Sequence, residues 1–124
     1  MSTSLAWAAA AVSVMTFLGH VFIGGPQVAR PLLDSDDLPT QARWLAYFCW
    51  HVTSLVVLAM GVGFAVVAVR GQHSDLAVFL PTLSALIWAL SIGITVVGGL
   101  PPRRNPGVWL FGLITLLGAT SAAL

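Results

Sequence analysis

The chain has 124 residues, of which 58% are hydrophobic and only 7% are charged. Soluble globular domains carry charge on roughly a quarter of their residues, and disordered chains combine low hydrophobicity with high charge, so both classes are excluded. Five arginines, no lysine and a formal net charge of +1 cannot build the broad basic face of a nucleic-acid-binding protein, so no nucleic-acid partner is expected. The composition instead predicts a protein whose main partner is the lipid bilayer.

Four long apolar stretches predict four transmembrane helices. A membrane-spanning helix needs about 20 apolar residues, and such stretches lie at about 5–23, 44–69, 76–100 and 108–124. Their apolar runs are continuous, whereas the strands of a membrane barrel alternate apolar and polar residues. We therefore predict an all-α integral membrane protein, with residues 1–124 forming a single domain of four transmembrane helices in an up-down antiparallel bundle.

Glycine and proline indicate where these helices begin and end. Gly24-Gly25-Pro26 is predicted to end the first span, because glycine tolerates a left-handed cap and proline stops a helix. Gly98-Gly99, followed by Pro101, predicts the same kind of ending for the third span. Asn105-Pro106 is predicted to open the fourth span as cap and first-turn proline, and Pro39-Thr40 to open the second, with Thr40 as its cap.

The arginines in the connecting segments predict how the chain is oriented. Arg30 and Arg43 follow the first span and Arg103 and Arg104 follow the third, whereas Arg70 alone lies on the opposite side. The positive-inside rule then places both arginine-rich loops in the cytoplasm and both termini outside. We expect the four cytoplasmic arginines to bind anionic lipid headgroups, each contributing about 1 kcal/mol. The lack of lysine and the abundance of Ala, Gly and Val suit a GC-rich bacterial genome, so a bacterial inner (plasma) membrane is predicted.

Small or weakly polar residues recur at helical spacing in every span. In lipid, such stripes let helices approach closely, because packing and modest hydrogen bonds drive their association. Four helices line no wide channel, so transport would require an oligomer. The stripes are Ala6, Ala9, Ser13, Thr16 and His20; His51, Ser54, Leu58, Gly61, Ala65 and Ala68; Ser84, Trp88, Ser91 and Thr95; and Gly107, Thr115, Gly118 and Ala122.

The sequence gives no support to catalysis. It contains no glutamate, and the intramembrane serines have no carboxylate to orient a base, so nucleophilic catalysis is not expected. The H-E-x-x-H spacing of metal-dependent hydrolases is missing too. The leading hypothesis is a non-enzymatic membrane protein without a cofactor. It is either a transporter- or channel-like oligomer or an accessory subunit of a larger membrane complex, with a homo-oligomer or such a complex as the expected assembly.

His20 and His51 are the residues most indicative of function, because ionisable groups inside a membrane are costly unless paired or hydrated. The first two spans are antiparallel neighbours, so both rings are expected in the same leaflet, sheltered between helices and offset by roughly 5 Å. In a structural interpretation, each ring bonds to a neighbouring group, with Ser54, Thr16 or Tyr47 as candidates.

Three functional interpretations of the same pair remain open. The first is a ligand or proton path formed by His20, His51, Ser54 and Tyr47. The second is a b-type haem-binding redox protein in which His20 and His51 are the axial ligands. The third is a metal site that adds the acidic loop residues Asp34, Asp36 and Asp37, which otherwise form a solvated loop.

Overall fold

The computed structural model describes residues 2–71 and 74–124. Within these residues the structure is helical and contains no strand, and four helical segments are long and apolar enough to cross a membrane. The all-α prediction with four candidate spans is therefore confirmed. The elements are α1 (Thr3–Gly19), the π-helix η1 (His20–Ala29), α2 (Arg30–Leu33), α3 (Thr40–Arg70), α4 (Asp75–Val97), the 3₁₀ turn η2 (Pro102–Arg104) and α5 (Pro106–Ala123).

Local capping chemistry explains most of the helix ends. The side chains of Ser2, Ser74 and Asn105 accept hydrogen bonds from first-turn backbone N–H groups of α1, α4 and α5, which otherwise lack partners. The predicted opening of α5 at Asn105-Pro106 is confirmed. At α3, Thr40 is the first helical residue and Pro39 is the cap without a side-chain bond, so Thr40 is not the predicted cap.

The first span does not end at Gly24-Gly25-Pro26, and that prediction is wrong. The helix continues through this segment to Leu33. Pro26 has no N–H to donate, and the helix widens so that the N–H of Arg30 donates to the carbonyl of Gly25, five residues back. Gly24 and Gly25 keep negative φ, whereas Gly99, after α4, has the left-handed φ of 62° that a helix-ending glycine adopts.

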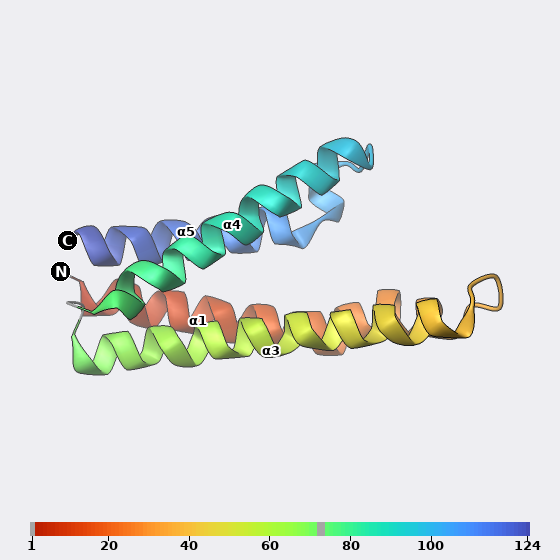
Figure 1. The fold of residues 1–124 in the computed structure, drawn as a ribbon. Helices are drawn as coiled ribbons and strands as arrows, with labels where there is room; N and C mark the ends of the chain where they lie inside the picture. The colour runs from red at the N-terminus through yellow and green to blue at the C-terminus, as the bar shows by residue number, and fades with distance from the viewer. Residues whose placement is uncertain (1, 72–73) are drawn as a thin grey trace.

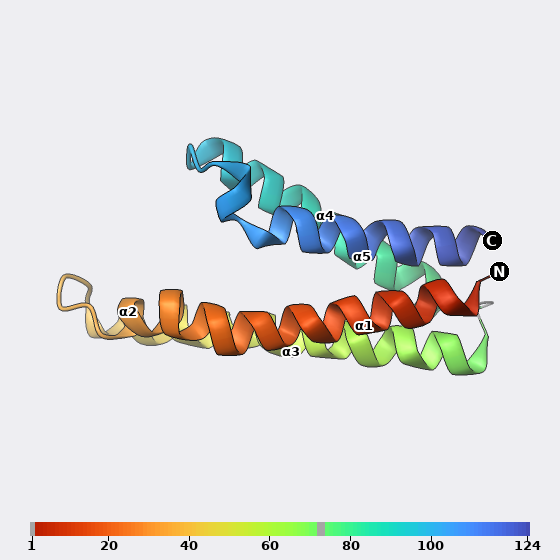
Figure 2. The same cartoon turned by 180° about the vertical axis from the view of Figure 1, so that it is seen from behind.

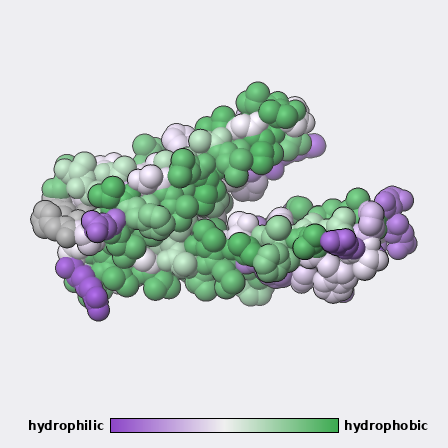
Figure 3. Space-filling view, viewed as in Figure 1, coloured by the Kyte–Doolittle hydropathy of each residue, from purple (hydrophilic) through white to green (hydrophobic). Residues whose placement is uncertain are grey.

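The helices form two hairpins. Figures 1 and 2 show α1, η1 and α2 lying along α3, and α4 lying along α5. The hairpins dock mainly through α1 and α5, at the end that holds both termini and the α3–α4 connection. Toward the other end the α4–α5 hairpin diverges from the first, and Figure 3 shows a wedge-shaped opening between them. The arrangement is therefore less compact than a closed four-helix bundle.

The two hairpins differ in length. The 31 residues of α3 rise about 46 Å, whereas the 18 residues of α5 rise about 27 Å. The hydrocarbon core of a bilayer is about 30 Å thick. The first hairpin is therefore long enough to extend well past this core at the end where η1, α2 and the start of α3 lie.

The buried hydroxyl groups of the described residues bond to backbone carbonyls, most of them within their own helix. Ser13 and Thr16 donate to carbonyls one turn back in α1, and Thr95 does the same in α4. Ser84 is fully buried and donates across the hairpin to the carbonyl of Phe111 at 3.1 Å. Each of these hydroxyls is satisfied by backbone, as buried polar groups in packed helices generally are.

Candidate functional site

His20 packs against Trp50 at the border of α1 and η1. The imidazole and indole rings are stacked, with centroids 4.0 Å apart and planes 14° from parallel. His20 Nε2 also donates to the carbonyl oxygen of Trp50 at 3.1 Å, and Ser54 Oγ donates to the same oxygen at 3.2 Å. The imidazole thus fastens η1 to α3, and His20 and Ser54 meet through a shared acceptor.

His51 lies elsewhere. It is exposed, so the expectation that both imidazoles are sheltered between helices is wrong for this residue. Its ring meets Tyr47 edge-on, with centroids 4.5 Å apart. The cause is helix geometry: adjacent residues point about 100° apart, so His51 points away from the contact between Trp50 and His20 and packs on Tyr47, one turn earlier in α3.

These contacts do not suit the two histidines as axial ligands of one haem. Bis-histidine ligation needs two imidazoles facing each other across the macrocycle. Here the Trp50 ring stacks on one face of His20, and His20 Nε2 donates its hydrogen bond to the Trp50 carbonyl. His51 packs on Tyr47 instead. Haem binding stays a prediction that this arrangement does not favour.

The proposed metal site with the acidic loop is likewise not assembled. Across residues 2–71 and 74–124, no three His, Cys, Asp or Glu side chains gather closely enough to hold a metal ion. His73, which the sequence places on the other side of the membrane, lies outside the described residues.

The four arginines expected at the headgroups fall into two groups. Arg30, Arg103 and Arg104 are exposed, and Arg30 pairs with Asp34 through Nε at 3.2 Å on an open surface. Such an exposed pair contributes little to stability. Arg43 instead donates to the carbonyl of Leu33 at 3.2 Å, which ties the end of α2 to the start of α3.

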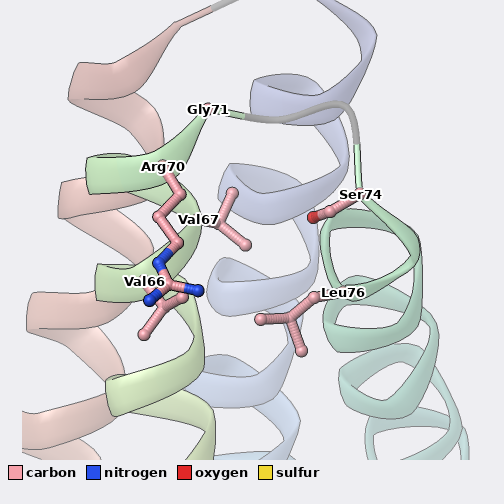
Figure 4. A pocket seen from close by; sticks show the side chains of 6 residues that line it. All are labelled: Val66, Val67, Arg70, Gly71, Ser74 and Leu76. Carbon is pink, nitrogen blue, oxygen red and sulfur yellow. The ribbon is translucent and has the colours of Figure 1, made fainter.

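Two grooves of similar size lie near opposite ends of the first hairpin. One, of about 280 Å³, lies between η1 and α3, and Arg30, Tyr47, Trp50 and His51 are among its lining residues. The other, of about 290 Å³, lies where α3 turns into α4. Figure 4 shows its lining residues Val66, Val67, Arg70, Gly71, Ser74 and Leu76.

Comparison with known proteins identifies no relative. No protein family, curated protein or solved structure matches this chain. Its function must therefore be argued from its own residues.

Sequence reasoning missed Trp50, which is the partner of His20. The signal available was Gly24: a Cβ there would lie 3.0 Å from the Trp50 ring, so only glycine lets the indole pack this closely. A glycine pair opposite a large aromatic residue indicates close helix packing as readily as a helix end.

Proposed function

We propose that this chain is a non-enzymatic, multi-pass membrane protein that acts as a subunit of an assembly. Its four candidate spans would cross the bilayer in alternating directions, with the lipid bilayer as the surrounding partner. The observation that carries the proposal is the wedge between the hairpins (Figure 3). Inner helix surfaces that the chain leaves uncovered are available to a second copy, and helix association in lipid depends on such close packing.

The hydrogen bonds of the buried hydroxyls favour an assembly function rather than a polar transport path within a single chain. Ser13, Thr16 and Ser54 each donate to a carbonyl one turn back, and Ser84 donates across the α4–α5 hairpin. These groups serve helix packing. A transporter- or channel-like function would then require the path to form between copies, and an accessory role in a larger membrane complex requires only the docking surface.

The assembly proposal predicts that the purified full chain is oligomeric. In nanodiscs, light scattering after size exclusion is expected to give a protein mass of two or more copies. Proton flux into liposomes carrying the protein is expected to equal that of empty liposomes.

A monomer in both nanodiscs and mild detergent would contradict self-assembly. Flux that is present in the wild type and lost on replacing His20 and His51 by alanine would favour the transport function instead. The matched control replaces Thr53 and Thr82, which are exposed and donate only to their own helix backbones.

We further propose that the chain lies in a bacterial inner membrane with both termini outside. The segments α2, the start of α3 and η2 lie at one end of the molecule, and the termini lie at the other (Figure 1). These segments carry Arg30, Arg43, Arg103 and Arg104. This grouping supports the positive-inside assignment.

The orientation predicts a labelling pattern. Cys49 is the single cysteine, so Cys49→Ala gives a background without thiols into which Ser35→Cys or Asp75→Cys is introduced. A membrane-impermeant maleimide is expected to label the Asp75→Cys protein in intact spheroplasts and the Ser35→Cys protein only after permeabilisation. The reverse pattern would place the termini inside.

A further inference from the structure

The groove between η1 and α3 is lined by both apolar and polar residues. Gly25 and Pro26 of η1 lie on one side, and Arg30, Tyr47 and His51 bring side chains that can donate hydrogen bonds. Its volume of about 280 Å³ is just below the range of about 300–1,000 Å³ typical of small-molecule sites. A compact polar group attached to a short stretch of hydrocarbon fits such a space better than a large ring system does.

The π-helix makes this groove. Pro26 lies in the wider helix in which Arg30 donates to Gly25, and a Cβ placed on Gly25 would meet no atom within 4 Å. The surface over Gly25 is therefore open. A regular helix bearing larger side chains here would fill the space beside Tyr47.

Residue counting places the groove across the boundary between the hydrocarbon core and the lipid headgroups of a bilayer. About 20 helical residues cross the hydrocarbon core. Counted back along α3 from Arg70, this length ends at Trp50, and counted along α1 from Thr3 it ends at Ile23. Arg30 and Tyr47 lie beyond these points, on the headgroup side, and His51 lies at the boundary itself, next to Trp50.

The donors on the rim have unused capacity. Within the described chain, Arg30 is paired only through Nε, to Asp34, so its terminal nitrogens remain available while the carboxylate orients them. Tyr47 and His51 contact each other through ring edges and make no hydrogen bond to another described residue. A guanidinium fork together with a hydroxyl and a ring N–H donor matches a phosphate group.

We propose that this groove binds one anionic phospholipid. Arg30, Tyr47 and His51 donate hydrogen bonds to the phosphate oxygens, and an acyl chain lies along Gly25 and Pro26. This site does not depend on the proposed assembly, because every residue that forms it belongs to one chain. It assigns Arg30 a specific ligand rather than a general attraction to the membrane surface.

The test is lipid binding to the delipidated full chain in detergent, followed by native mass spectrometry. Dioleoyl phosphatidylglycerol is expected to bind at one molecule per chain, about tenfold more tightly than dioleoyl phosphatidylcholine, because the latter's choline cation is repelled by Arg30. Millimolar inorganic phosphate is the third probe. If it displaces the lipid, the groove takes free phosphate and the lipid assignment is wrong.

Matched variants distinguish binding in the groove from general effects of net charge and added side-chain bulk. Arg30→Gln and Gly25→Leu are each expected to weaken phosphatidylglycerol binding about tenfold, and the uncharged change Tyr47→Phe about threefold. Arg70→Gln removes the same charge from an exposed arginine at the other end of the first hairpin, and Gly93→Leu adds the same bulk where a Cβ meets nothing; both are expected to bind as the wild type does.

Two further results would overturn the proposal. One is equal loss in Arg30→Gln and Arg70→Gln, which would mean that only net charge matters. The other is wild-type binding by Gly25→Leu, which would mean that the lipid lies elsewhere. Helix content measured by circular dichroism checks that each variant is folded, and Tyr47→Phe keeps the ring that packs on His51, so it tests the hydroxyl with the least structural change.

Discussion

Replacing Gly118 by leucine is expected to separate the two hairpins and to lower the free energy of unfolding by about 3 kcal/mol. Gly118 lies in α5 where Phe64 of α3 and Pro81 of α4 converge. Even a Cβ there would lie 2.8 Å from the Phe64 ring and 3.3 Å from Pro81. Phe64 is 2% exposed, so its ring has no free space to move into. The measurement is SDS-induced unfolding of the full chain in detergent micelles.

A double-mutant cycle shows whether the clash with Phe64 is the cause. Phe64→Ala alone is expected to cost about 3 kcal/mol through the cavity it leaves. The free-energy loss in the double variant with Gly118→Leu is expected to be smaller than the sum of the two single losses by more than about 1 kcal/mol, since leucine fills that cavity. Gly93→Leu is the matched control, because Gly93 is exposed and its Cβ position is open. Additive losses would contradict the contact.

Asn105→Ala is expected to cost about 2–3 kcal/mol, because this side chain serves both helices of the second hairpin. Its Oδ1 accepts from the N–H of Gly107 at 3.1 Å, and its Nδ2 donates to Thr95 Oγ1 at 2.8 Å and to the carbonyl of Ser91 at 3.3 Å. A lost cap costs about 1 kcal/mol and each lost hydrogen bond about the same. The same SDS titration measures the loss.

Ser74→Ala is the control for Asn105→Ala. Ser74 caps α4 by accepting from the N–H of Ala77 at 3.4 Å and is exposed. Its replacement is therefore expected to cost only about 1 kcal/mol. Equal losses in the two variants would show that the bonds from Asn105 to α4 contribute nothing.

The parts of the fold that depend on local chemistry could be predicted from sequence. Continuous apolar runs require helices in a bilayer, because every backbone polar group must then be satisfied within its own segment. Gly99 and Asn105 act at helix ends through their own φ angle or side chain, so those boundaries were predictable too.

The π-helix could not be predicted in the same way. Whether Pro26 ends a helix or widens it depends on what packs beside it. Here, Trp50 lies against Gly24 and His20 fastens the segment to α3. Those contacts join residues 30 or so positions apart, so no local pattern encodes them.

The candidate site depends on the rotation of α3 about its own axis. Apolar residues surround this helix, so the sequence does not fix whether Trp50 or His51 faces η1. The structure turns Trp50 inward and leaves His51 exposed beside Tyr47. The prediction that both imidazoles are sheltered between helices is wrong for His51, because neighbouring residues on a helix point in different directions.

The docking of the first helix onto the last has a consequence for biosynthesis. Ser121 donates to the carbonyl of Ser2 at 2.9 Å, and the two residues are 119 positions apart. Contacts this distant in sequence form late, because both partners must first exist. The first hairpin is therefore synthesised with one side of α1 uncovered, and this side is covered only when α5 packs against it. During that interval, the uncovered side is the part of the nascent chain most open to capture by other membrane proteins.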